Sequence, residues 1–246
     1  MTTILIYIFA YITHLNFRNQ IEEIDLPVDS VDVIVSEWMG YFLLYESMLD
    51  SVLFARDKWL VKDGIIFPDK AILYLCGVED AHVKNDRVEF WKDVYGFDMT
   101  PIQQIAMKEP VVDVVDSKAI NTKPSEILHI DILTCTKEDL EFKVPFTLEA
   151  SRDDYVHGLV GYFECAFTQV HKPIGFSTSP FCRYTHWKQT IFYLEDTLTI
   201  CRGETISGEI TCKPNQKNRR DLDIGIHVKF DGRHSSVDKE MDFRLR

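Results

Sequence analysis

The sequence predicts two parts, an open α/β sheet followed by an all-β domain, and three observations support this prediction. Between residues 14 and 60, short β-branched runs alternate with helical spacing, which is typical of an α/β sheet. Beyond residue 71, short strand-like runs alternate with turn residues, which is typical of a barrel or sandwich. The chain has 246 residues, of which 46% are hydrophobic, so it can bury a sizeable core.

The α/β part is predicted from successive segments of the chain. Residues 14–18 alternate like a strand, and residues 31–35 form the β-branched run expected of a buried parallel strand. Residues 45–60 carry apolar side chains at helical spacing, and residues 62–64 (Lys-Asp-Gly) supply a turn. This order of strand, loop, helix and strand indicates a Rossmann-like sheet, which we expect to end near residue 68.

The β part is predicted from short apolar runs that turn residues separate. These runs span residues 71–76, 127–133, 159–167, 190–193 and 224–230. Residues 84–116 interrupt the series with a segment rich in aromatic side chains, which we expect to form a helical projection. We therefore assign residues 1–68 to the α/β part and residues 69–246 to a β-barrel.

The net charge of the chain limits the kinds of molecule that we expect it to bind. Thirty-nine acidic residues against 27 basic ones give a net charge of −12. Such a surface repels nucleic acid and membrane headgroups and attracts basic proteins or peptides. The plain alternative, that the acidity only keeps the protein soluble, stands beside this interpretation.

The six cysteines show no C-x-x-C spacing. A chain of this size and apolar content needs no disulfide framework, so we expect free and mostly buried thiols in a reducing compartment. We propose no metal site.

Residues 1–12 are apolar and uncharged. The run is shorter than the roughly 20 residues that a membrane-spanning helix needs, and it lacks the basic start of a secretory signal. We expect a buried strand or a mis-assigned start rather than a membrane anchor.

Residues 36–48 form the most informative stretch, with the sequence SEWMGYFLLYESM. Its two glutamates, Glu37 and Glu46, bracket a loop that contains Gly40 and follows a predicted parallel strand, where open α/β sheets bind ligands. The pair can act in acid/base chemistry, bind a metal or bind a cation, or it can merely cap a turn and a first helical turn. A metal-dependent hydrolase is disfavoured because no histidine lies at ligand spacing near either glutamate.

This stretch resembles the double-glutamate loop of protein arginine methyltransferases. The resemblance extends from about residue 12 to the last residue, and it includes the Tyr-Thr-His-Trp-Lys-Gln run of residues 184–189 and the Asn-Arg-Arg-Asp-Leu-Asp run of residues 218–223. The Thr-His-Trp form is typical of type I members, which make monomethyl and asymmetric dimethyl arginine. The resemblance implies S-adenosylmethionine as the cofactor.

The resemblance also assigns catalytic roles. It implies that Glu37 and Glu46 bind and activate the guanidinium of a substrate arginine, and that His186 helps to hold the active site. The chemistry is reasonable, because arginine stays protonated and two carboxylates can bind it through charge-assisted hydrogen bonds that leave one nitrogen free to attack. Without the motif, a lone histidine such as His186 would be read as structural.

Three further residues are implied to bind the cofactor. Glu22 matches the acidic position that reads the adenine amino group, Ile21 would pack on the adenine ring, and Met48 would lie near the transferred methyl group. The alternatives are an exposed loop glutamate for Glu22 and an ordinary core methionine for Met48.

Partners and location follow from the resemblance as well. It implies Arg/Gly-rich proteins and histone tails as substrates, without a membrane or direct nucleic-acid contact. Residues 84–116 would be a dimerisation arm that forms a homodimer or a heterodimer. We expect the protein in the cytoplasm and the nucleus.

The sequence departs from the family pattern at its N-terminal side. Family members carry a V-L-D-x-G-x-G-x-G turn for the cofactor, a helix with a Y-F-x-x-Y motif and an acidic partner for His186. This sequence has no G-x-G. We therefore expect the chain alone to bind S-adenosylmethionine weakly or not at all. The alternative hypothesis is a non-catalytic form that acts as a dimerisation or regulatory partner of a longer homologue.

Overall fold

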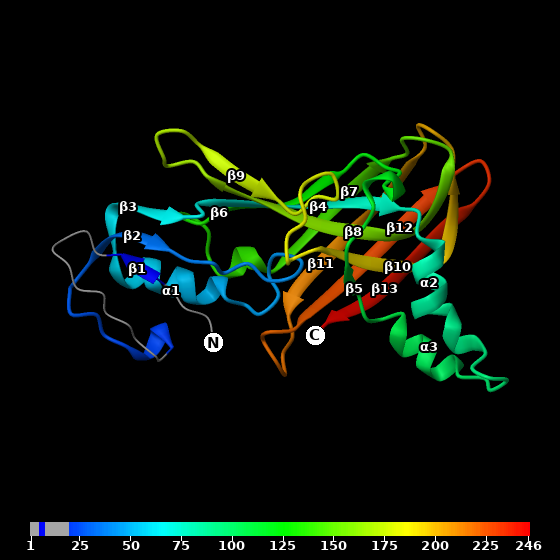
Figure 1. The fold of residues 1–246 in the computed structure, drawn as a ribbon, viewed down its shortest axis with the longest axis horizontal. Coiled ribbons are helices and arrows are strands. Elements are labelled where there is room, and N and C mark those ends of the chain that lie inside the picture. The colour runs from blue at the N-terminus through cyan, green and yellow to red at the C-terminus, as the bar shows by residue number, and fades with distance from the viewer. Residues whose placement is uncertain (1–4, 8–19) are drawn as a thin grey trace.

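The computed structural model describes residues 5–7 and 20–246 of the chain. The α/β part lies at one end, the β part follows it, and a helical projection leaves the far end (Figure 1). The strand predicted for residues 14–18 lies outside the described residues. The predicted fold class, an α/β sheet followed by a β-barrel, is confirmed.

A small sheet forms the α/β part, in the order β1-β2-β3. β1 (Leu5–Tyr7) runs antiparallel to β2 (Val31–Val35), and β2 runs parallel to β3 (Leu60–Phe67). The strand predicted for residues 31–35 is therefore confirmed. The helix α1 (Leu49–Trp59) connects β2 and β3, as a parallel pair requires.

Two local predictions in this part were wrong. The helix begins at Leu49 rather than at residue 45, because the preceding residues form a tight loop with left-handed backbone angles. The turn predicted for residues 62–64 lies inside β3, where the pairing with β2 shifts register between Leu60 and Ile65. A Lys-Asp-Gly sequence thus makes an irregularity within a strand instead of ending it.

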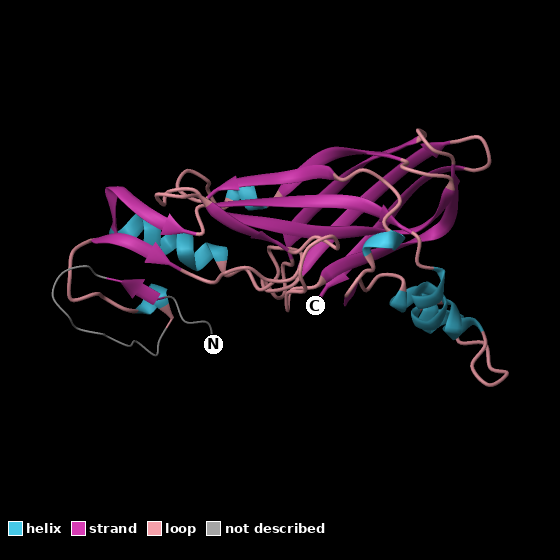
Figure 2. Cartoon of the chain, turned by 45° about the horizontal axis from the view of Figure 1, so that its top comes forward, coloured by secondary structure: helices cyan, strands magenta, loops and turns pink. Residues whose placement is uncertain are grey.

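Two larger sheets form the β part and pack around a shared core (Figure 2). One has the order β5-β10-β8-β4-β6, with β9 paired to β8, and the other has the order β13-β12-β11-β7. The strands are β4 (Lys70–Val78), β5 (Val111–Asp113), β6 (Ser125–Asp131), β7 (Phe142–Glu149), β8 (Asp154–Phe167), β9 (Ile174–Ser177), β10 (Gln189–Ile200), β11 (Thr205–Pro214), β12 (Leu222–Asp231) and β13 (Ser236–Leu245). Each of the five predicted runs lies in or overlaps one of these strands.

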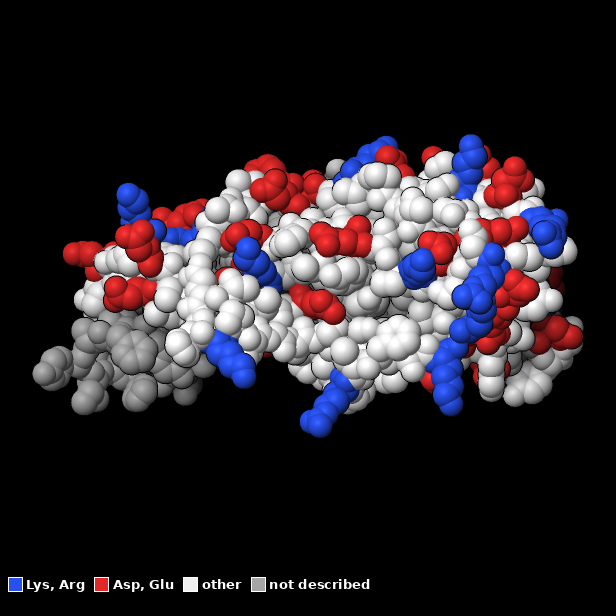
Figure 3. Space-filling model, turned by 90° about the horizontal axis from the view of Figure 1, so that it is seen from above, with Lys and Arg blue, Asp and Glu red and all other residues white. Residues whose placement is uncertain are grey.

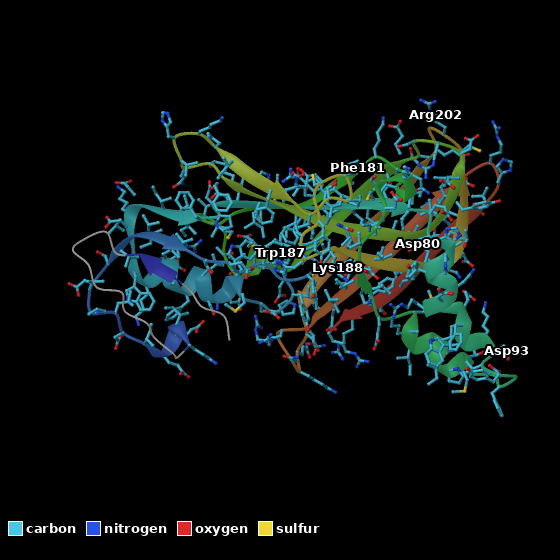
Figure 4. The ribbon with its side chains drawn as sticks, in the orientation of Figure 1. Asp80, Asp93, Phe181, Trp187, Lys188 and Arg202 are labelled. Carbon is cyan, nitrogen blue, oxygen red and sulfur yellow. The ribbon has the colours of Figure 1, made fainter. Side chains whose placement is uncertain are left out.

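Short helices make up the projection between β4 and β5. They are α2 (Ala81–Arg87), η2 (Glu89–Lys92) and α3 (Thr100–Ala106). Elsewhere in residues 20–246, three more single-turn helices are formed, η1 (Ile21–Glu23), η3 (Ser117–Ala119) and η4 (Glu138–Leu140). The projection leaves the end of the molecule opposite to the α/β part, with Asp93 near its tip (Figures 1 and 4).

One hydrophobic cluster runs from the α/β part into the β part. It includes Ile34 of β2 and Leu53 of α1 together with Phe146 and Ile226 of the β strands, all of them buried. The division into domains at residue 68 stays a prediction, since the packing is continuous across it.

Cysteine burial follows the expectation of free thiols in the main. Cys76, Cys135, Cys165 and Cys212 are buried, whereas Cys182 is exposed. Within residues 5–7 and 20–246, no helix combines the length and the apolar character that a membrane crossing requires.

Candidate functional site

The loop of residues 36–48, called here the double-glutamate loop, follows the carboxyl end of β2. Four of its residues that are not glycine have left-handed backbone angles, with φ of 50° at Phe42, 65° at Leu43, 77° at Glu46 and 56° at Ser47. Each such residue costs of the order of 1–3 kcal/mol, and such costs gather at functional sites. The loop therefore needs support from the rest of the molecule.

Packing supplies part of this support. Phe42 is 2% exposed and meets Phe192 of β10 edge to face, with ring centroids 5.1 Å apart. Gly161 of β8 makes room for that ring, because a Cβ there would lie 2.3 Å from it. Gly40 is equally constrained, since a Cβ would lie 1.9 Å from the carbonyl oxygen of Tyr45. The loop is thus anchored in the barrel by an apolar plug.

The Thr-His-Trp run supplies a second anchor. The indole Nε1 of Trp187 donates a hydrogen bond of 2.8 Å to the carbonyl oxygen of Met39. The Trp187 ring stacks on Phe176 of β9, with centroids 5.3 Å apart. In Figure 4, Trp187 lies where the α/β part meets the barrel. The run therefore ties the double-glutamate loop to the β8–β9 hairpin.

Lys188, the next residue in the chain, contacts β5, the strand that follows the projection. Its Nζ lies 3.1 Å from Oδ1 of Asp113 in β5. This contact raises the pKa of Lys188, and it lowers the pKa of Asp113 after the larger effect of the Val114 backbone N–H.

The two glutamates occupy different surroundings. Glu37 is exposed at the end of β2 and lies near the buried Cys165; burial raises the pKa of the Cys165 thiol to about 12, and the Glu37 carboxylate adds to the rise. Glu46 is half-buried, and its Oε1 lies 3.0 Å from Nη2 of Arg220. Both carboxylates keep contact with solvent, so a cation can approach each of them.

The contacts of His186 do not test its predicted catalytic role. Its side chain is exposed, and its ring lies against Trp187 with centroids 3.9 Å apart. The assignment of Glu37, Glu46 and His186 as catalytic residues stays a prediction.

The residues predicted to bind the cofactor lie around the start of α1. Oε1 of Glu22 in η1 accepts a hydrogen bond of 2.5 Å from Ser51 Oγ. Ile21 is half-buried against the main cluster, and Met48 is the residue that precedes α1. An exposed carboxylate can accept a hydrogen bond from an amino group such as that of adenine, so the chemistry of Glu22 fits this part of the cofactor. These assignments also stay predictions.

Polar groups of the loop also remain without partners. Ser36 Oγ and Trp38 Nε1 are buried, and neither has a hydrogen-bond partner among the described residues. Buried groups of this kind cost roughly 1–3 kcal/mol each. They flank Glu37 at the edge of the sheet where a ligand is expected.

A cavity of about 750 Å³ opens in the β part, between β4, β8, β9 and residues 182–185. Its lining includes Glu164, Cys165, Phe176 and Tyr184. The Glu37 carboxylate helps to raise the pKa of the Cys165 thiol, after the larger effect of burial. The cavity was not predicted from the sequence, because it forms between segments far apart in the chain.

Arg220 was not predicted from the sequence as a site residue either. It lies in the Asn-Arg-Arg-Asp run that carried the resemblance, but only the fold brings it to Glu46. Two adjacent arginines in an acidic chain were the available signal. No three His, Cys, Asp or Glu side chains of the described residues are placed to bind a metal ion.

Comparisons with known proteins agree with these features. The family model described as the arginine methyltransferase oligomerization subdomain matches residues 69–233. Over 229 residues, the chain is 55% identical to protein arginine N-methyltransferase 1 of Chlamydomonas reinhardtii and 54% identical to probable protein arginine N-methyltransferase 1.2 of Arabidopsis thaliana. The match covers 93% of this chain, but the chain spans only 66% and 63% of the length of these relatives.

Solved structures are similar as well. The Trypanosoma brucei PRMT1 enzyme–prozyme heterotetrameric complex with AdoHcy matches with a TM-score of 0.89 and 42% identity, over 92% of this chain and 72% of that one. Arabidopsis thaliana protein arginine methyltransferase 10 matches with a TM-score of 0.77 and 25% identity, over 92% of this chain and 73% of that one. This chain belongs to the protein arginine N-methyltransferase family.

Proposed function

We propose that the chain carries the guanidinium-binding part of an S-adenosylmethionine-dependent protein arginine N-methyltransferase of type I. The observation that carries the proposal is the double-glutamate loop, which holds Glu37 and Glu46 at the carboxyl end of a parallel strand in a strained but anchored conformation. Both carboxylates remain open to a cation from solvent.

The proposed mechanism begins with a substrate arginine that is protonated, because its pKa lies above 12. Glu37 and Glu46 accept hydrogen bonds from the guanidinium and draw its positive charge toward themselves. The nitrogen that they leave free then has electron density for attack. S-adenosylmethionine, when bound, would supply an electrophilic methyl group on a sulfonium for transfer to that nitrogen, with the neutral thioether as the leaving group. A proton leaves the methylated nitrogen for a carboxylate or water.

For the cofactor, we propose that Ile21 and Glu22 contact the adenine and that Met48 lies near the methyl group. The Trypanosoma brucei structure contains AdoHcy, the product of the cofactor, which supports this choice. The sequence has no G-x-G turn, so the residues present supply only part of a pocket. We therefore propose that this chain alone binds S-adenosylmethionine weakly or not at all, and is inactive by itself.

For substrates, we propose Arg/Gly-rich proteins and histone tails. A net charge of −12 supports basic partners, although acidic and basic side chains are interspersed over the face in Figure 3. We propose the cytoplasm and the nucleus as locations.

A second candidate function is a non-catalytic partner of a longer homologue. The match to an oligomerization subdomain supports it, as does the enzyme–prozyme assembly of the Trypanosoma brucei relative. The projection exposes apolar side chains for such a contact, among them Tyr95 at 96% and Phe97 at 71%. A homodimer or a heterodimer can form through it.

Calorimetric titration of the purified chain with S-adenosylmethionine, followed by a methyl-transfer assay on an Arg/Gly-rich peptide, separates the two. Micromolar binding, about −8 kcal/mol, with transfer that Glu37→Gln and Glu46→Gln each reduce at least 100-fold would support the enzyme and overturn inactivity of this chain. No heat and no transfer, together with co-purification with a longer homologue, would support the partner. Transfer that survives both substitutions would contradict the assigned roles.

A further inference from the structure

The turn between β11 and β12 is held by its own polar contacts. Asn218 Nδ2 donates a hydrogen bond of 2.7 Å to Oδ1 of Asp221. The backbone N–H of Asp221 donates a hydrogen bond of 3.0 Å to the carbonyl oxygen of Asn218. Asn215 closes the base, because its backbone N–H donates to the carbonyl oxygen of Asp221 and its Nδ2 donates to Asp223. Contacts within residues 215–223 therefore define the conformation of the turn.

This turn meets the double-glutamate loop through three contacts. The backbone N–H of Glu46 donates a hydrogen bond of 2.8 Å to the carbonyl oxygen of Arg220, and Ser47 Oγ donates a hydrogen bond to the carbonyl oxygen of Arg219. The third contact is the ion pair of 3.0 Å between Arg220 Nη2 and Glu46 Oε1. Glu46 and Ser47 are two of the four loop residues with left-handed backbone angles. The turn thus holds the strained half of the loop at the point where the carboxylate projects.

We propose that Arg220 is a positioning residue for Glu46, and this inference rests on the proposed function of the double-glutamate loop. The Arg220 guanidinium contacts one carboxylate oxygen, Oε1, and orients the carboxylate while Oε2 stays available to the guanidinium of a substrate. A half-buried carboxylate next to solvent would otherwise sample several rotamers. Arg220 holds the Glu46 carboxylate in one orientation before the substrate binds. Substrate binding then does not carry the conformational entropy cost of ordering the Glu46 side chain.

The neighbouring arginine provides a matched control. Arg219 lies in the same turn and is as exposed as Arg220, but its Nη2 lies 3.4 Å from Asp50 of α1 and not near Glu46. Removal of either side chain deletes one exposed cation of similar size. Only removal of Arg220 deletes the contact with Glu46.

Amide hydrogen exchange on the 246-residue chain tests the proposal without any need for activity. We expect Arg220→Met to speed exchange of loop amides within residues 40–48 by about 2- to 5-fold, as loss of a part-exposed ion pair predicts. Arg219→Met should change these amides less than 1.5-fold, and Arg220→Lys should restore at least half of the effect. The double variant Arg220→Met, Glu46→Gln should exchange no faster than the faster single variant, because both substitutions remove the same pair.

Equal effects of the two arginine variants, additive effects in the double variant, or no change with Arg220→Met would overturn the proposal. Thermal unfolding midpoints within about 2 °C of wild type show that each variant folds, and the Asn218–Asp221 amides report whether the turn itself survives.

If the chain transfers methyl groups, Arg220→Met should lower kcat about 10-fold with less than 2-fold change in the peptide KM, and Arg220→Lys should recover part of kcat. An equal fall in kcat for Arg219→Met would contradict positioning. If the wild-type chain transfers none, as proposed for the chain by itself, the exchange result alone decides the role of Arg220.

Discussion

The double-glutamate loop and the helical projection differ in how far their aromatic side chains are buried. In the loop, Phe42 and Trp38 are each 2% exposed, and strained backbone angles are offset by contacts with the barrel. In the projection, Tyr95 is 96% and Phe97 71% exposed, with few contacts to the rest of the chain. The aromatic side chains of the loop are thus covered by this chain, whereas the projection presents exposed apolar surface, which fits the contact with a partner proposed above.

This difference has a consequence for energy. A substitution in the loop removes contacts that the chain makes with itself, so it should change the free energy of unfolding. A substitution in the projection should change association instead. Matched pairs of variants, one in each region, can test this difference.

The largest effect is expected for the aromatic plug. Phe42→Ala should lower the free energy of unfolding by about 3–5 kcal/mol, because it leaves a cavity between Phe192 and Gly161. Phe97→Ala should change it by less than about 0.5 kcal/mol, since the side chain is mostly exposed. Urea unfolding of both variants measures the difference. Similar losses would mean that the projection packs on the molecule as firmly as the loop does.

A smaller effect is expected for the two indole hydrogen bonds. Trp187→Phe removes the donor to the buried Met39 carbonyl and should cost about 1–2 kcal/mol. Trp91→Phe removes an exposed bond of 3.2 Å to the Arg87 carbonyl, so it should cost no more than about 0.5 kcal/mol. The same unfolding measurement applies. A Trp187→Phe variant as stable as wild type would remove the Thr-His-Trp run from the anchors of the loop.

The smallest effect is a dependence on pH. The Val114 N–H and Lys188 lower the pKa of Asp113, and the Thr100 hydroxyl and N–H lower the pKa of Asp98 in the projection. A lowered folded-state pKa adds stability above the ordinary carboxyl value of about 3.9 and loses it as pH falls through the folded value.

Unfolding of Asp113→Asn should therefore show a deficit against wild type at pH 7 that shrinks toward pH 2. Asp98→Asn should show a smaller deficit, because Asp98 bonds only Thr100, two positions away, and keeps part of that contact when unfolded, whereas Asp113 also bonds the distant Lys188. A deficit for Asp113→Asn that is constant with pH would mean that packing, not charge, explains it.

Much of the fold could be predicted because its signals are local. β-branched and alternating runs identified β2 and most of the long barrel strands, and the glutamates and the Thr-His-Trp run identified the family. The errors had tertiary causes. Residues 62–64 look like a turn, yet parallel pairing with β2 keeps them inside β3. Residues 45–48 have helical spacing, yet Glu46 and Ser47 are held in left-handed angles by the β11–β12 turn.

Two carboxylates on a glycine-containing loop and an aromatic-rich insertion can be identified from the amino-acid sequence. The surroundings of these groups depend on the three-dimensional fold. Arg220 reaches Glu46 and Trp187 reaches Met39 across long separations in the chain, and the 750 Å³ cavity forms between β4, β8 and β9. The physical reason is that residue type and spacing act within a few residues, whereas an ion pair or a cavity depends on the path of the whole chain.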